Sequence, residues 1–98
     1  MSAVVLTRDL MDASRFKAAL PGVVTARSLA ALEMADATLV LLDLALGLDV
    51  AEVVALGVPV VAYGAHVEAD ALAAALAAGC VDALPRSKVF RRAAELLG

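Results

Sequence analysis

Short apolar runs rich in valine and leucine alternate along this chain with segments in which apolar residues recur every three to four positions. Most of these runs are continuously apolar, which indicates strands buried on both faces, as in a parallel sheet covered by helices. The expected strands are residues 4–6, 23–25, 39–42, 59–62 and 81–84. The alternation predicts a doubly wound α/β layer and excludes a sandwich, a helical bundle or an eight-stranded barrel.

The expected helices end at ordinary stop signals. Pro21 and Gly22 close the first helix, Gly57 ends a short helix over residues 50–56, and Gly79 ends a helix over residues 68–78. Ser87 is the expected N-cap of the last helix, residues 88–97. A length of 98 residues suits one compact domain spanning residues 1–98.

Composition excludes several classes of protein. A hydrophobic fraction of 63% excludes intrinsic disorder, and the longest uncharged stretch, residues 53–67, is too short to span a bilayer. A net charge of −3 argues against a nucleic-acid-binding surface. With one cysteine, Cys80, and one histidine, His66, we expect neither a disulfide nor a zinc site. The N-terminus lacks a signal-peptide pattern, so we expect a cytoplasmic protein.

The expected helix over residues 68–78 is apolar on every face, because residues 71–78 are only alanine and leucine. An outer helix of an α/β layer normally has a polar face. Two interpretations stay open: alanine is tolerated at the surface because it is the best helix former, or the helix packs against a partner or a second copy. The candidate interface residues are Leu72, Ala75, Leu76 and Phe90.

In open α/β sheets, ligands bind beyond the carboxyl ends of the strands. The residues that follow the expected strands include Thr7, Arg8, Asp9, Arg27, Ser28, Asp43, Tyr63, Gly64, His66, Arg86 and Ser87. Asp43 is the most informative of them, because a carboxylate at the end of a buried strand needs a cation or hydrogen-bond donors. Tyr63 is expected to pack at the same edge with its hydroxyl bound, and Cys80 is expected to be a small core residue.

Three blocks of the sequence resemble the receiver domains of two-component response regulators. Residues 43–49 are similar to the phospho-acceptor loop, residues 57–66 to the stretch around the fourth strand, and residues 79–87 to the segment that carries a lysine. The resemblance runs from end to end. It implies a flavodoxin-like (βα)5 fold with a parallel five-stranded sheet in strand order 2-1-3-4-5. Separately, we expect a single receiver-like domain without an output domain.

Receiver domains carry a metal-binding acidic pair after the first strand, a phospho-accepting Asp after the third, a Ser or Thr after the fourth and a Lys after the fifth. The resemblance places Asp43 at the acceptor position, Thr7 and Arg8 at the acidic pair, Gly64 at the hydroxyl position and Arg86 at the lysine. Only Asp43 keeps the residue type of the family, so the implied active site is degenerate.

Phosphoryl transfer to an aspartate requires Mg²⁺, which prefers oxygen ligands and is repelled by an arginine at a ligand position. Asp9 could supply one carboxylate through a shifted register, so Asp9 and Asp43 are the only weak candidates for metal ligands. We therefore expect no metal and no cofactor, with Mg²⁺ needed only if the chain is a working phospho-receiver.

Two arrangements of Asp43 stay open. Asp43 could form a permanent ion pair with Arg8, with Arg86 or with both, because a guanidinium offers donors suited to a carboxylate. Such a pair would lock the receiver in one state. Alternatively, two arginines beside one aspartate leave a positive charge for an anionic ligand.

The expected function is that of a stand-alone, non-enzymatic pseudo-receiver, which signals by phosphorylation-independent contacts with a protein partner. A homodimer through the face of helix 68–78 is one form of such contact. Two alternatives remain: a phospho-receiver with Asp43 as acceptor, and a flavodoxin-like module that binds a small anion through Arg8, Arg86 and backbone N–H groups at helix starts. We expect neither nucleic acid nor a membrane as a partner.

Overall fold

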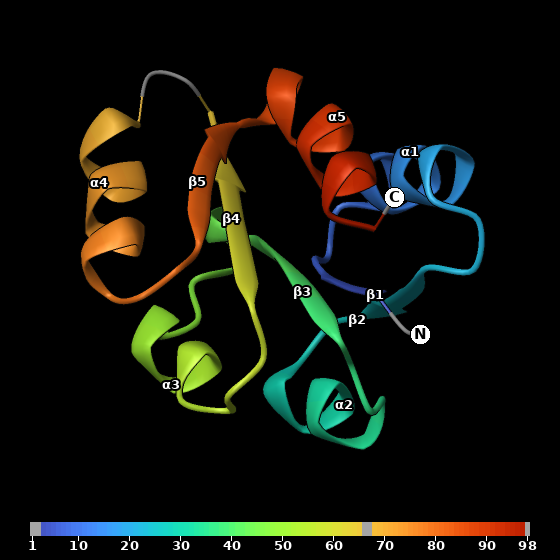
Figure 1. The fold of residues 1–98 in the computed structure, drawn as a ribbon, viewed down its shortest axis with the longest axis horizontal. Coiled ribbons are helices and arrows are strands. Elements are labelled where there is room, and N and C mark those ends of the chain that lie inside the picture. Colours follow the sequence, from blue (N-terminus) through green and yellow to red (C-terminus); the bar gives the residue numbers. More distant parts are fainter. Residues whose placement is uncertain (1–2, 66–67, 98) are drawn as a thin grey trace.

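A computed structural model describes residues 3–65 and 68–97 of the chain. One parallel sheet in the order β2-β1-β3-β4-β5 forms its centre (Figure 1). The strands are β1 (Ala3–Leu6), β2 (Val24–Ala26), β3 (Leu39–Asp43), β4 (Val60–Gly64) and β5 (Asp82–Pro85). The helices are α1 (Leu10–Ala19), α2 (Leu29–Met34), α3 (Val50–Val54), α4 (Ala69–Ala77) and α5 (Arg86–Leu97), with a 3₁₀ turn η1 (Leu44–Leu46) after β3.

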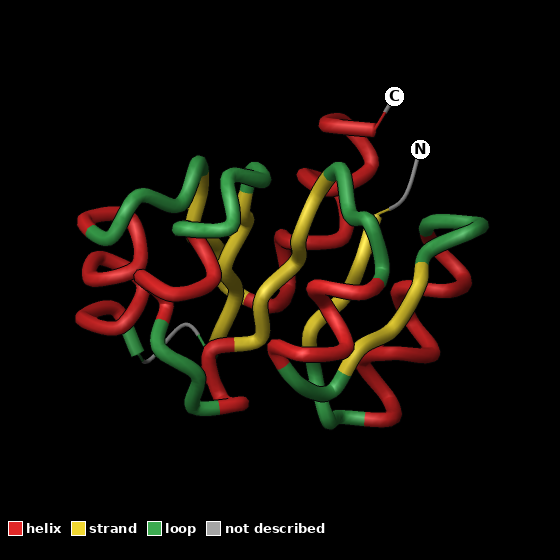
Figure 2. Tube along the Cα trace, turned by 90° about the horizontal axis from the view of Figure 1, so that it is seen from below, coloured by secondary structure: helices red, strands yellow, loops and turns green. Residues whose placement is uncertain are grey.

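The sheet separates two apolar clusters, because successive side chains of a strand point to opposite faces. On β3, Leu39 and Leu41 face α1 and α5, whereas Val40 and Leu42 face α2, α3 and α4. Figure 2 shows the strands side by side with helices on both sides of them. The predicted doubly wound α/β layer and the strand order implied by the resemblance are both confirmed.

The start of the last helix differs from the expectation. Helix α5 begins at Arg86, immediately after β5, so Ser87 lies inside its first turn and is not its N-cap. The reason is Pro85, which lacks a backbone N–H and therefore ends the strand, leaving the chain free to turn at once into the helix.

The candidate interface residues on α4 and α5 differ in how exposed they are. Ala75 is 1% exposed and packs into the core, so it is unavailable to a partner, and the expectation for that residue is wrong. The physical reason is that its methyl group faces the sheet. Leu72 and Phe90 are half-buried, and Phe90 packs on Phe16 with ring centres 4.4 Å apart. Leu76 is 49% exposed and remains an interface candidate.

Gly79 allows α4 to end close to α3. Its φ is +112°, and a Cβ there would lie 2.9 Å from Cγ1 of Val54, so both the backbone and the neighbour require glycine. Cys80, which follows it, is buried in the core as expected. None of the helices within residues 3–65 and 68–97 is long and apolar enough to cross a membrane.

Candidate functional site

Asp43, the last residue of β3, lies at the carboxyl edge of the sheet and is 4% exposed. Its Oδ2 accepts a hydrogen bond of 2.7 Å from the Thr7 hydroxyl, which follows β1. Its Oδ1 accepts from the backbone N–H of Ala45 at 2.9 Å, which caps η1. Each carboxylate oxygen is therefore already bound by a donor of the chain itself.

Arg86 extends from the start of α5 across the ring of Tyr63 toward two carboxylates. Its Nε donates to Oδ2 of Asp12 at 3.0 Å, and its Nη2 lies 4.0 Å from Oδ1 of Asp43. Burial lowers the pKa of Arg86, but the hydrogen bond to Asp12 and the charges of Asp12 and Asp43 outweigh that effect, so its pKa is raised overall. The guanidinium is a permanent cation between two carboxylates.

Asp12, in the first turn of α1, completes this arrangement and is 3% exposed. In addition to Arg86, its Oδ2 accepts a hydrogen bond of 3.3 Å from the hydroxyl of Tyr63. Burial is the main cause that raises the pKa of the Tyr63 hydroxyl well above its ordinary value. A hydrogen bond with Thr7 lowers the pKa, but the negative charges of Asp43 and Asp12 raise it further. Tyr63 is therefore a neutral donor, and the expectation that it packs with its hydroxyl bound is confirmed, although the whole side chain is buried.

Sequence reasoning did not select Asp12. The available signal was its spacing, because Asp12 lies four residues before Phe16, a buried residue of α1, and eight before Leu20, the buried C-cap of that helix. Positions separated by four residues lie on one face of a helix. A carboxylate on the buried face of an amphipathic helix needs a partner, and here the partners are Arg86 and Tyr63.

Arg8 does not pair with Asp43. Arg8 is exposed and forms no ion pair with any of the described residues, so the expected contact between these two side chains is wrong. Thr7 precedes it with its side chain directed to Asp43, which leaves the next side chain to point toward solvent. The expected pair with Arg86 is present only at 4.0 Å, and the shorter contact of Arg86 is with Asp12.

Asp9 acts as the N-cap of α1. Its Oδ1 accepts from the backbone N–H groups of Met11 at 2.9 Å and Asp12 at 3.0 Å, and its own N–H donates to the Thr7 hydroxyl at 3.0 Å. This cap fixes the start of α1 and thereby the position of Asp12. The Asp9 carboxylate that was a weak candidate ligand is thus bound to backbone donors.

A cavity of about 190 Å³ opens at this edge of the sheet. It is lined by Arg8, Asp9, Asp43, Ala45, Leu46 and Arg86. Two guanidinium groups accompany its two carboxylates, and both carboxylates already accept backbone hydrogen bonds, so the lining does not fit Mg²⁺. Across the part of the chain that the structure describes, no group of three or more histidine, cysteine or acidic residues could hold a metal ion.

The same lining does not fit an anion. Arg8 pairs with no carboxylate of the described residues, but the formal charges of Arg8 and Arg86 sum to zero with those of Asp9 and Asp43 in the lining, and Asp12 adds a further negative charge behind Arg86. An anion entering the cavity would meet no net positive charge.

Gly64 ends β4 beside this site. A Cβ at Gly64 would lie 3.7 Å from Cδ1 of Leu44, which is an ordinary contact, so the position has room for a Cβ, but it carries no hydroxyl. His66, another residue of the predicted carboxyl edge, lies outside the described residues.

Two solved structures share this fold along nearly their whole length. A response regulator from Thermotoga maritima superimposes with a TM-score of 0.77 at 18% identity, covering 98% of this chain and 96% of that one. A signal receiver domain of a DNA-binding response regulator protein from Colwellia psychrerythraea 34H superimposes with a TM-score of 0.74 at 16% identity, covering 99% and 98%. Neither a protein-family model nor a curated protein matches the sequence. The chain has the fold of a receiver domain.

Proposed function

We propose that this chain is a pseudo-receiver, a signalling protein of the receiver fold that acts through protein–protein contacts without phosphorylation of Asp43. The proposal includes the absence of enzymatic activity and independence from Mg²⁺. The alternative functions, a phospho-receiver and an anion-binding module, both need chemistry that the lining of the carboxyl-edge cavity does not favour.

The observation that supports the proposal is the bridge that Arg86 makes between Asp12 and Asp43. A nucleophilic carboxylate needs a free oxygen and a cation that can also contact the incoming phosphoryl group. Here Oδ2 of Asp43 is held by Thr7, Oδ1 is held by Ala45, and the nearest cation is fixed on Asp12 by a 3.0 Å hydrogen bond. An attack on phosphorus would have to use an oxygen that already accepts a hydrogen bond, and Arg86 would have to leave Asp12 to contact the phosphoryl group.

The bridge that Arg86 makes between Asp12 and Asp43 also favours a single conformational state of the domain. Asp12 belongs to α1, Asp43 to β3 and Arg86 to α5, so one guanidinium ties together three elements at the edge where receiver domains bind their phosphoryl group. No buried side-chain nitrogen or oxygen of the described residues lacks a hydrogen-bond partner. A fully satisfied buried network rigidifies its surroundings, which favours constitutive binding over switching.

Self-association through α4 is part of the proposal. Leu76 on this helix is 49% exposed, and Val81, which follows the helix, is 54% exposed. Burying apolar side chains of this size against a second copy favours association by about 25 cal/mol for each Å² removed from water. Sedimentation of the natural chain and of a Leu76→Glu variant tests this: the natural chain should form a dimer and the variant a monomer.

Treatment with acetyl phosphate and Mg²⁺, followed by intact-protein mass spectrometry, tests the central part of the proposal. The chain should not gain the mass of a phosphoryl group. A phosphorylated species that disappears in an Asp43→Asn variant would establish the phospho-receiver alternative instead.

A further inference from the structure

Basic residues gather around the first half of α5. Of the eight lysine and arginine residues in the chain, four lie on this helix: Arg86, Lys88, Arg91 and Arg92. Arg15 of α1 lies beside the helix, with its guanidinium 4.4 Å from the centre of the Phe90 ring. Because the net charge of the whole chain is −3, this region is opposite in sign to the rest of the molecule.

Three of these cations are not neutralised by a carboxylate. Arg86 is paired with Asp12, and Arg92 is paired with Asp82 at 3.0 Å and with Glu95 at 3.5 Å. Within residues 3–65 and 68–97, Arg15, Lys88 and Arg91 form no ion pair, and all three side chains are exposed. Their charges are therefore available to a partner.

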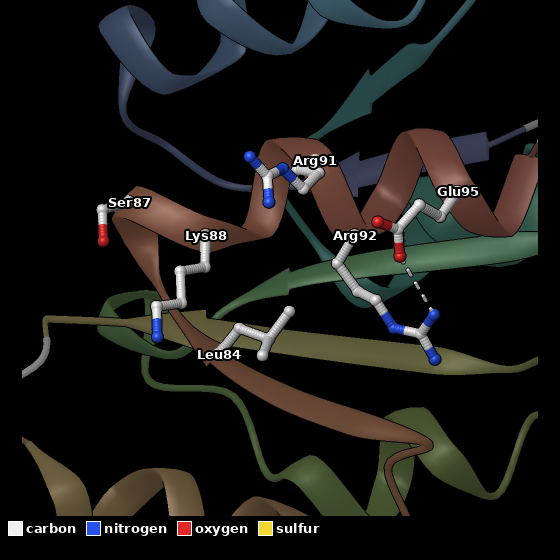
Figure 3. Close-up of a pocket in the computed structure, with 6 residues that line it drawn as sticks. All are labelled: Leu84, Ser87, Lys88, Arg91, Arg92 and Glu95. Atoms are coloured by element: carbon white, nitrogen blue, oxygen red, sulfur yellow. Dashed lines mark hydrogen bonds and ion pairs between the residues drawn. The ribbon is translucent and has the colours of Figure 1, made fainter.

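The surface is hollowed where these side chains emerge. A cavity of about 480 Å³ is lined by Leu84, Ser87, Lys88, Arg91, Arg92 and Glu95. Figure 3 shows Lys88 and Arg92 directed from α5 toward the side of β5, where Leu84 lies, while Arg91 is directed toward α1. A second cavity of about 340 Å³ is lined by Arg15, Ala65, Pro85, Arg86 and Ser87. Ser87 belongs to both linings, so the two hollows adjoin at the start of α5.

We propose that this cationic surface, defined by Arg15, Ser87, Lys88 and Arg91 around the two hollows, binds an acidic segment of a partner protein. The inference rests on the proposed function and specifies the chemistry of the partner. Carboxylates of the segment pair with Lys88 and Arg91, and an apolar side chain of the segment packs on Leu84. This places the contact on the first half of α5, where the smaller hollow reaches Arg86 and so adjoins the carboxyl-edge cavity.

The charge distribution favours a protein segment over a nucleic acid. A nucleic-acid surface needs an extended row of cations that follows the phosphates, whereas three unpaired cations surround two hollows here. Glu95 lines the larger hollow, and the rest of the chain is acidic, so a long polyanion would be repelled beyond the cluster. The apolar Leu84 in the lining fits a hydrophobic side chain better than a phosphate backbone.

A fluorescence anisotropy titration of the full chain tests the inference, with a labelled synthetic peptide that alternates glutamate and leucine as the probe. The variant is Lys88→Glu with Arg91→Glu. Its matched control is Lys17→Glu with Arg27→Glu, which makes the same change in net charge at exposed basic residues elsewhere. We expect the α5 variant to bind the peptide about tenfold more weakly and the control to bind it within about twofold of the natural chain.

Further measurements decide the outcome. Replacing every glutamate of the peptide by glutamine should abolish binding, and amide shifts on addition of the acidic peptide should centre on residues 84–92. Equal weakening by the control variant, or tighter binding of a DNA oligonucleotide than of the peptide, would overturn the inference. Because no step of this test uses phosphate or Mg²⁺, its failure is distinguishable from phosphorylation of Asp43, which would refute the proposed function.

Discussion

The side chains of Arg86 and Asp12, which are 74 residues apart in the sequence, meet through a hydrogen bond of 3.0 Å. Asp12 is buried, and about a third of the Arg86 side chain is exposed, at 34%. The pair joins the first turn of α1 to the first residue of α5, and Arg86 is then within 4.0 Å of Asp43. Arg86, which the resemblance places at the lysine position of receiver domains, is thus held by Asp12. The resemblance assigns no role to Asp12.

An Asp12→Ala variant should be less stable than the natural chain by about 2 kcal/mol. The substitution removes a buried carboxylate with two donors and leaves Arg86 and Tyr63 without their acceptor, while the partial exposure of Arg86 limits the cost. Urea denaturation followed by circular dichroism measures the free energy of unfolding. Asp70→Ala, at an exposed position in α4, is the matched control and should cost less than about 0.5 kcal/mol. Equal losses in both variants would mean that the buried pair contributes nothing.

Tyr63 should make stability fall at high pH. The folded state raises the pKa of its hydroxyl, so above the unfolded pKa of about 10 the folded chain retains a proton that the unfolded chain has lost. The contribution of Tyr63 is therefore complete below pH 10 or so and declines as pH rises further. Tyr63 is the single tyrosine in a chain without tryptophan, so tyrosinate absorbance follows this one residue.

The control for that experiment is Tyr63→Phe. At neutral pH this variant should lose about 1 kcal/mol with the 3.3 Å hydrogen bond to Asp12. At alkaline pH its stability should fall less steeply than that of the natural chain. Tyrosinate absorbance that develops in the folded protein with an ordinary midpoint would contradict the account of this side chain.

The architecture was predictable from the sequence because buried parallel strands appear as continuous apolar runs, of which residues 39–42 are the clearest. Strand order was not, because apolar periodicity does not define neighbours; it came from the resemblance alone. The site was only half predictable. Thr7 and Arg8 are adjacent in sequence, but the Thr7 side chain is buried against Asp43 and the Arg8 side chain is exposed. The sequence does not determine which of the two neighbours points inward. Asp12 was missed because an acidic residue in the first helical turn is ordinarily explained by the helix dipole.

Restoring the family's residue types should restore metal binding. A variant that carries Thr7→Asp, Arg8→Asp and Arg86→Lys removes both guanidinium groups from the cavity, adds a carboxylate to its lining at residue 8 and adds a second one beside Asp43 at residue 7. Gly64→Ser can be added, because a Cβ there makes only ordinary contacts. This variant should show Mg²⁺-dependent amide shifts around Asp43 that the natural chain does not show. The same shifts in the natural chain would contradict the electrostatic argument, and adding Asp43→Asn to the restored variant should abolish them.

A Gly79→Ala variant should be destabilised by about 2 kcal/mol. Both the positive φ and the 2.9 Å approach of the new Cβ to Val54 oppose the substitution. Gly57→Ala has a similar backbone penalty with open space around it, so it should cost about 1 kcal/mol. Thermal unfolding compares the two variants, and a difference near zero would show that α3 yields to the added methyl group.

The most direct test of the central claim is an amide NMR titration of the natural chain with Mg²⁺ and beryllofluoride, a mimic of the aspartyl-phosphate group. The Asp43→Asn variant is run beside it. Because Asp43 is bound by Thr7 and Ala45 and faces Arg86, we predict a spectrum without shifts. Shifts that centre on Asp43, Gly64 and Arg86 and are absent from the variant would show a working phospho-acceptor and contradict the account.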